Sequence, residues 1–265
     1  MKRNILKFSS CLLFFVSFSS CRKVIHVDLN STNPKIVVEA SISDEPGPYT
    51  VSLYKTVNFD QSNSFPAVSG AVVKISDDAG NFELLTETSS GIYATSSLQG
   101  VPGRVYTLEI SADGKTYTSV SGMPLPAAID TLLIQNYPFG NIKLVNVYFQ
   151  DSTGISNYYQ FGLEVNTIPS KSIFIIDDTF QDGTKMEYSL FGQRDSLLKT
   201  GDSVLVSLRS IDKGAYEYLR TLSLLTGDGG GPPSDSPANP VSNISNGALG
   251  YFSAYSVRKK LIVVQ

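Results

Sequence analysis

Four carboxylates near the middle of the chain are the side chains best placed for acid–base chemistry. Asp177 and Asp178 follow the apolar run at 173–176, and Asp182 and Glu187 come shortly after them. A glycosidase needs two facing carboxyl groups about 5 to 9 Å apart. Neighbouring residues of an extended strand point to opposite faces, so Asp177 and Asp178 cannot form such a pair. We therefore interpret them as a solvated strand end and keep a carboxylate-dependent glycosidase as an alternative function.

Other catalytic and ligand-binding patterns are missing from the sequence. The single histidine, His26, lies in a polar N-terminal segment, so no Ser-His-Asp or Cys-His set and no histidine-based metal site is expected further along the chain. Residues 77–81 resemble the start of a calcium loop, but Thr88 stands where the bidentate glutamate belongs. The glycines at 227–231 lack the Lys-Ser/Thr ending of a phosphate loop. The sequence thus predicts a non-enzymatic protein without a catalytic residue, metal or cofactor.

The N-terminus has the layout of a signal peptide. Lys2, Arg3 and Lys7 precede an apolar run at 11–18, and two serines precede Cys21. The run is shorter than the roughly 20 apolar residues that span a bilayer. Small residues before a cysteine resemble a lipobox, in which the cysteine thiol takes a diacylglyceryl group. We predict that residues 1–20 are removed and that Cys21 is lipidated; an ordinary cleavable signal with an incidental cysteine is the alternative.

Cleavage would change the thiol content and the charge of the chain. Of the 2 cysteines, Cys11 lies in the leader, so the mature body has no disulfide and no thiolate metal site. Removing residues 1–20 takes three cations and no acid from 21 Lys and Arg and 24 Asp and Glu, which leaves a net charge of −6. An acidic body without basic runs argues against nucleic-acid binding. Contact with a membrane is therefore expected through the lipid anchor alone.

The elements behind the anchor are expected to be mainly strands. Residues 21–35 are polar and predict a tether, and 36–123 predict an Ig-like β-sandwich because short alternating segments are separated by turns. Two prolines at 124 and 126 predict a boundary, after which 124–265 form a larger sandwich-like or barrel-like β-domain. One helix is expected over about 212–226, between an Asp212 N-cap and Gly227. The expected strands are 36–40, 49–54, 71–76, 81–87, 92–94, 104–111, 116–121, 129–135, 143–150, 158–165, 172–176, 185–191, 203–209, 249–255 and 260–264.

The C-terminal segment carries a resemblance to a known family. Residues 239–255, read as NPVSNISNGALGYFSAY, resemble the closing motif of a Bacteroidota lipoprotein family classified as a domain of unknown function. Weaker matches are at 21–28, 35–40, 70–73, 180–183 and 201–204. The resemblance implies an outer-membrane lipoprotein, often associated with TonB-dependent receptor systems, and implies no activity. Arg22 and Lys23 replace the acidic residues that usually follow the lipidated cysteine and favour surface export, so the membrane face stays open.

The same resemblance brings a modification pattern into consideration. Bacteroidota attach O-glycans at Asp-Ser/Thr-apolar or Asp-Ser/Thr-Thr triplets of proteins outside the cytoplasm. Ordinary turn chemistry is the alternative for each triplet. Four residues fit the pattern and follow Asp130, Asp151, Asp195 and Asp202 respectively, namely Thr131, Ser152, Ser196 and Ser203.

Together these features predict an accessory or binding lipoprotein of the cell envelope. Its expected partners are the membrane, through the lipid, and a TonB-dependent receptor or another envelope protein. A structural or adhesive surface lipoprotein and the glycosidase are the alternatives. Ligand identity, membrane face and oligomeric state are not specified by the sequence.

Overall fold

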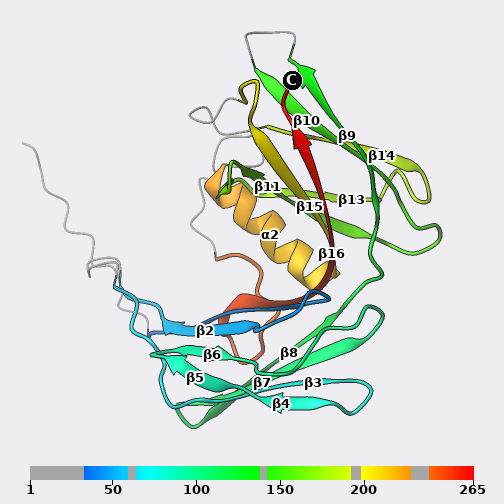
Figure 1. Cartoon of the computed structure of the whole chain (residues 1–265). Helices are drawn as coiled ribbons and strands as arrows, with labels where there is room; N and C mark the ends of the chain where they lie inside the picture. Colours follow the sequence, from blue (N-terminus) through cyan, green and yellow to red (C-terminus); the bar gives the residue numbers. More distant parts are fainter. Residues whose placement is uncertain (1–32, 59–63, 138–141, 192–197, 228–238) are drawn as a thin grey trace, which may run out of the picture. The chain divides into compact units, whose positions relative to one another are not determined.

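The structure is a computed structural model that describes residues 33–58, 64–137, 142–191, 198–227 and 239–265 (Figure 1). Within these residues it is mainly β, with two sandwich-like cores and one helix, which confirms the predicted fold class. The leader, Cys21, His26 and Ser196 lie outside the described residues, as does the tether up to residue 32.

The first core lies between two sheet layers. Alternation along the strands places Tyr106, Leu108 and Ile110 on one face, and all three are fully buried, as the sequence predicts. Their sheet has the order β4 (Phe82–Leu84), β3 (Val72–Asp77), β7 (Val105–Ala112) and β8 (Lys115–Gly122). The facing layer contains β1 (Ile36–Ser43), β2 (Thr50–Lys55), β6 (Ile92–Ala94) and β5 (Thr86–Ser89).

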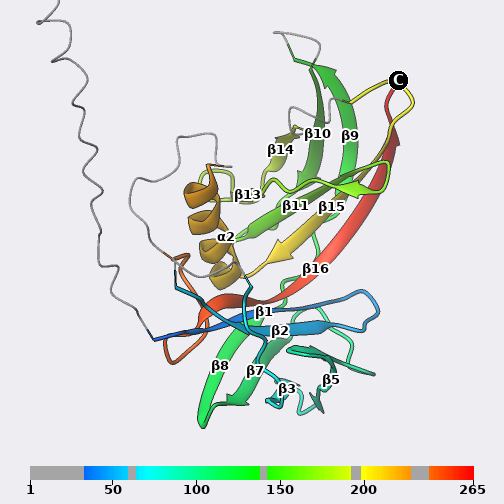
Figure 2. The ribbon, with the colours of Figure 1, turned by 90° about the vertical axis from the view of Figure 1, so that its left-hand side faces the viewer.

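The second core has the same two-layer construction. Phe149 packs edge-to-face against Tyr159 and Phe161, with ring centroids 4.8 and 5.8 Å away. One layer is the three-stranded sheet of β9 (Ile129–Asn136), β10 (Lys143–Gln150) and β14 (Lys185–Leu190). The other contains β11 (Tyr158–Val165), β12 (Ile168–Pro169), β13 (Phe174–Asp177) and β15 (Ser203–Ile211). Figure 2 labels β11, β13 and β15 of this layer.

A single long strand, β16 (Leu249–Val263), belongs to the β1 layer of the first core and to the β15 layer of the second. Its first half pairs in parallel with β1, from Val37↔Leu249 to Ser43↔Tyr255. Its second half pairs antiparallel with β15, as far as Ser203↔Val263. The prediction of two closing strands, at 249–255 and 260–264, is therefore wrong. The polar residues between them stay in the ladder, because Arg258 and Lys259 pair with Leu208 and Ser207 of β15. Their side chains form ion pairs with Asp44 and Glu45, each at 2.7 Å.

Helix α2 (Lys213–Thr226) begins and ends where the sequence predicts. The side chain of Asp212 accepts a hydrogen bond from the N–H of Ala215, and Gly227 closes the helix in the left-handed conformation at φ 77°. Ala215 and Leu219 pack on Ile211 at the end of β15. The described part of the chain has no helix with the length and apolar character needed to cross a bilayer.

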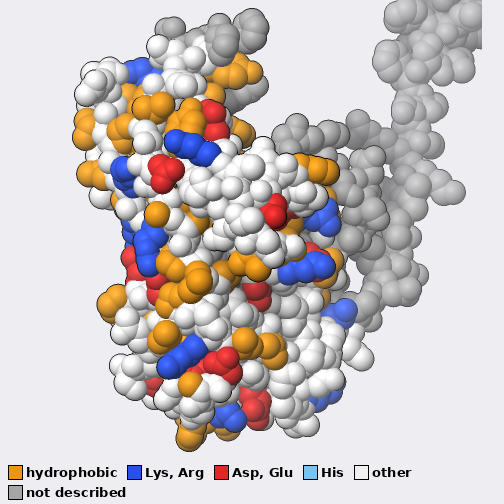
Figure 3. All heavy atoms as spheres, turned by 90° about the vertical axis from the view of Figure 1, so that its right-hand side faces the viewer, with side chains coloured by type: hydrophobic (Ala, Val, Ile, Leu, Met, Phe, Trp, Pro, Cys, Tyr) orange, Lys and Arg blue, Asp and Glu red, His pale blue; other side chains and the backbone are white. Residues whose placement is uncertain are grey.

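Charges on the surface are mixed in sign. On the face shown in Figure 3, cationic and acidic side chains alternate among scattered hydrophobic ones. Elsewhere in the described part of the chain, individual charges form pairs, such as Arg104 with Asp77 at 2.5 Å and Lys74 with Glu109 at 3.0 Å. Neither sign therefore dominates this face.

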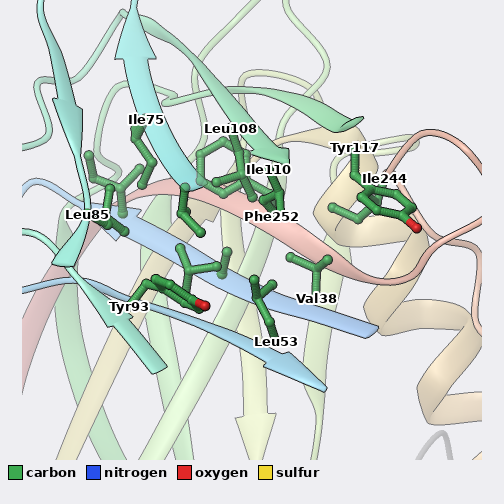
Figure 4. Packing of buried hydrophobic residues seen from close by; sticks show 14 of the residues in the cluster. Val38, Leu53, Ile75, Leu85, Tyr93, Leu108, Ile110, Tyr117, Ile244 and Phe252 are labelled. Carbon is green, nitrogen blue, oxygen red and sulfur yellow. The ribbon is translucent and has the colours of Figure 1, made fainter. Parts of the chain in front are cut away.

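The C-terminal segment completes the first core. Phe252, with Ile244, Ala248 and Ala254, is buried among residues of the β1 and β7 layers (Figure 4). Asn243 holds the segment in a loop, because its amide donates to the carbonyl of Phe252 at 2.7 Å and accepts from the N–H of Phe252 at 2.9 Å. The first sandwich thus contains residues far outside 36–123, and the NPVSNISNGALGYFSAY segment has a structural role.

Candidate functional site

Asp177 and Asp178 diverge at the end of β13, as strand alternation predicts. The interpretation of the pair as a solvated strand end is wrong, because Asp177 is half-buried and Asp178 is only 5% exposed. The carboxylate of Asp177 turns to α2 and accepts a hydrogen bond from the Tyr216 hydroxyl at 2.8 Å. Burial favours a raised pKa for Asp177, but hydrogen bonds from Thr179 and Tyr216 outweigh it and lower the pKa. Burial and the same bond to Asp177 raise the pKa of Tyr216 to about 12. Asp177 is thus a charged anchor for the helix.

Asp178 instead meets two other carboxylates. Oxygen atoms of Asp151, Asp178 and Asp182 all lie within 4.8 Å of one another, and we call these three residues the carboxylate cluster. Asp151 and Asp178 follow β10 and β13 and are only 3% and 5% exposed, whereas Asp182 is exposed. Glu187, the fourth predicted acid, lies apart on β14 and accepts from the Tyr148 hydroxyl at 2.7 Å.

Hydrogen bonds fix the two turns that carry the carboxylate cluster. Asp151 accepts from the Tyr159 hydroxyl and from the N–H of Gly183, the latter at 2.8 Å. Asp178 accepts from the N–H of Asn157, and Asp182 from the N–H of Gly154, both at 2.8 Å. Gly154 and Gly183 have φ values of 82° and 68°, a conformation that glycine adopts without strain.

The carboxylate cluster has the composition of a site for a hard cation. Within the described residues, none of its members forms an ion pair with a lysine or arginine. Buried carboxylates are costly unless they are paired or coordinate a metal. Calcium takes carboxylate and carbonyl oxygens at about 2.3–2.6 Å, so two ligands across one ion are about 5 Å apart, close to the spacing in the cluster. Asp151, Asp178 and Asp182 could therefore hold Ca²⁺.

A calcium titration tests this assignment. We expect calcium added to chelator-treated protein to raise the unfolding temperature, because an ion that binds the folded state stabilises it by about 2.7 kcal/mol at a hundredfold excess over Kd. Asp178→Asn should abolish the calcium response, whereas the adjacent Asp177→Asn should retain it. Differential scanning fluorimetry with and without calcium measures both. An identical midpoint for the unmutated protein in the two conditions would contradict the assignment.

Exposed apolar side chains lie on the two turns of the carboxylate cluster. Phe180 is 96% exposed and Ile155 is 60% exposed. Ile155 also lines a surface hollow of about 410 Å³, together with Tyr158, Asp178 and Asp182, whereas Phe180 is outside this lining. The two turns therefore combine the carboxylate cluster with two exposed apolar side chains, Phe180 and Ile155, which we call the apolar rim.

The comparison with protein families gives a match across both cores. A family model described as a domain of unknown function (DUF4249) matches residues 22–261. The chain belongs to this family. The DUF4249 match includes the carboxylate cluster, helix α2 and the C-terminal segment, and its name assigns no activity.

Curated proteins and solved structures add no functional assignment to this DUF4249 chain. No curated protein matches it. A two-fibronectin type III segment from chicken tenascin is 17% identical and covers 68% of this chain and 91% of its own, with a TM-score of 0.21. A cytokine receptor complex is 9% identical, covering 86% and 95% respectively, with a TM-score of 0.25. At these TM-scores neither structure carries an argument here.

The predicted glycosylation residues occupy three different settings in this DUF4249 chain. Thr131 is exposed on β9, and Ser152 is exposed in the turn that follows Asp151. Ser203 is half-buried, and its N–H donates to the side chain of Asn166 at 2.9 Å. Glycosylation at these residues, and at Ser196 outside the described part, stays a prediction.

Sequence patterns did not identify Asp151 as a member of an acidic site. In the sequence it is only the first residue of a glycosylation triplet, and no metal ligand is predicted. The available signal was local: Asp151 is followed by Gly154, and Asp182 by Gly183, a pattern typical of turns that bring carboxylates together. In contrast, the rejected calcium loop at 77–81 is an ordinary turn in which Asp77 binds Asn81 and Arg104.

Proposed function

We propose that this DUF4249 chain is a lipid-anchored, non-enzymatic accessory or binding protein of the bacterial outer membrane, associated with a TonB-dependent transport system. The leader and Cys21 support the anchor, and the polar segment after Cys21 leads directly to the first strand at Ile36. A short polar tether of this kind would keep the β-body near the membrane and free to meet an envelope partner.

The observation that carries the binding role is the apolar rim at the carboxylate cluster. Phe180 exposes almost its whole side chain, although water disfavours such a surface. The turn beneath it is held by backbone hydrogen bonds, from Gln181 to Asp178 at 2.7 Å and from Thr184 to Gln181 at 3.0 Å. An aromatic side chain on a fixed turn loses little entropy on binding and is a typical interface anchor.

Co-purification from detergent-solubilised membranes tests the role of this rim. We expect Phe180→Ser to reduce the recovery of the envelope partner by about tenfold, corresponding to the loss of about 1.4 kcal/mol of binding. Phe82→Ser is the matched control, because Phe82 is also an exposed phenylalanine, at 66%, and lies on β4 at the surface of the first sandwich. Quantitative mass spectrometry of the eluate measures recovery and identifies the partner.

Two results of that experiment would count against the proposal. Equal recovery with Phe180→Ser and with the unmutated chain would remove the rim from the interface. Recovery of the unmutated chain without any envelope protein would instead favour the structural or adhesive alternative, which predicts a defect only in attachment assays.

A carboxylate-dependent glycosidase is the second candidate function, because two of its four predicted acids do meet. Asp178 and Asp182 have oxygens within 4.8 Å of each other, beside a hollow that Tyr158 also lines. The third carboxylate, Asp151, favours a cation over a sugar at this place. Hydrolysis of an aryl glycoside that is lost in Asp182→Asn would support the glycosidase and contradict the non-enzymatic proposal.

A further inference from the structure

A second polar hollow lies on the sheet face that carries α2, beyond the helix. Tyr158 of β11 packs against the helix, and by alternation Gln160, Gly162 and Glu164 share its face. The hollow has a volume of about 260 Å³. It lies over β11, β15 and β16, and the segment from Pro169 to Ser172 also lines it.

Arg209 brings a cation without an anionic partner into this hollow. Among the described residues it forms no ion pair, and its Nε is buried without a hydrogen-bond partner. Its guanidinium lies over the ring of Tyr255, 5.1 Å from the centroid, and Nη1 makes one long contact of 3.4 Å with Gln160. An arginine has five N–H donors, so most of its capacity for a carboxylate or phosphate is unused.

The floor of the hollow is kept open by Gly162. The strand register places Gly162 opposite Ser207, and Ser207 opposite Lys259. A Cβ at position 162 would overlap the hydroxyl of Ser207, which would have to rotate away, so a larger residue here would fill part of the hollow. Lys259 adds a second cation at the edge, although it also pairs with Glu45.

We propose that this hollow binds a small hydroxylated carboxylic acid, of the class to which uronic acids belong. Its carboxylate would accept two parallel hydrogen bonds from the guanidinium of Arg209. This bidentate geometry fits a planar carboxylate better than the ammonium of a lysine does. Ser207, Gln160 and the acid Glu164 offer partners for the several hydroxyl groups of such a ring, more than an inorganic anion carries. This site is separate from the carboxylate cluster and does not depend on the proposed envelope partner.

Binding measured on the full chain in detergent tests the inference, with glucuronate as the probe and glucose as its neutral counterpart. By isothermal titration calorimetry, we expect glucuronate to bind at least about tenfold more tightly than glucose. Arg209→Gln should weaken glucuronate binding by about tenfold or more. Arg209→Lys keeps a positive charge at this position, and should still weaken binding because it loses the bidentate geometry. Lys115→Gln, which removes an exposed cation elsewhere, should change nothing.

Three outcomes would overturn the inference. The first is no glucuronate binding up to about 50 mM, where even millimolar affinity would be measurable. The second is equal affinity of the unmutated chain and both Arg209 variants for glucuronate. The third is equally tight, Arg209-dependent binding of inorganic phosphate, which would show an unspecific anion site.

Discussion

Cys21→Ala is expected to transfer the protein from the membrane fraction to the soluble fraction. Each buried CH₂ of an acyl chain contributes about 0.8 kcal/mol, and stable anchoring takes more than one chain. Without these chains, an acidic body with mixed surface charge has no comparable attraction to an anionic lipid surface. Ultracentrifugation followed by immunoblotting measures the distribution.

Ser20→Ala is the matched control for the anchor, because it keeps a small residue before the cysteine. It should leave the protein in the membrane pellet. Unchanged retention of Cys21→Ala after a carbonate wash would reject lipid anchoring at this residue.

Gly250→Ala is expected to cause the largest loss of stability in the described part of the chain. Gly250 lies in β16 at a φ of 90°, opposite Val38 in the parallel pairing with β1. A Cβ there would overlap the backbone carbonyl of Val38. Because this carbonyl belongs to the paired strand β1, it cannot move aside as the end of a flexible side chain could. Strain and overpacking together should cost about 3–5 kcal/mol. Thermal unfolding should show a midpoint lower by about 10 °C.

Gly247→Ala separates the two contributions. Gly247 also has a positive φ, 71°, but its Cβ would meet nothing within 4 Å. It should therefore lose only about 1–2 kcal/mol, the cost of the left-handed backbone conformation for a residue with a Cβ. Equal midpoints for the two variants would show that the overlap with the Val38 carbonyl adds nothing to the strain of the positive φ.

Local patterns predicted most of the strands and the helix. Alternation identified the face of Tyr106, Leu108 and Ile110, and the cap residues Asp212 and Gly227 identified the ends of α2. The expected strand at 81–87 is in fact β4 and β5, which belong to different sheets. The segment 81–87 keeps the residue pattern of one strand although it passes from one sheet to another. Where β4 ends and β5 begins therefore depends on their pairing partners, which the local pattern does not reveal.

Long-range contacts set the limits of prediction for β16 and for the carboxylate cluster. Arg258 and Lys259 look like a break between two strands until Asp44 and Glu45 supply their partners. Likewise Asp151 approaches Asp178 only because β10 and β13 end near each other in different layers. Neither contact leaves a periodic signal in the neighbouring residues.

The C-terminal family motif has a physical explanation that the sequence alone did not offer. The Asn243 side chain hydrogen-bonds to the backbone of Phe252, and the N–H of Ser245 donates to the carbonyl of Thr118 in β8. Because Gly250 has no Cβ, β1 can pack closely against it. These contacts join the end of the chain to the first core. The motif therefore identifies how the fold closes.

Mass spectrometry of the N-terminal peptide of the purified mature protein tests the membrane anchor most directly. The peptide should begin at Cys21 and carry the mass of a diacylglyceryl group on its sulfur. A peptide with a free thiol at that position, or one that still contains residues 1–20, would contradict the account.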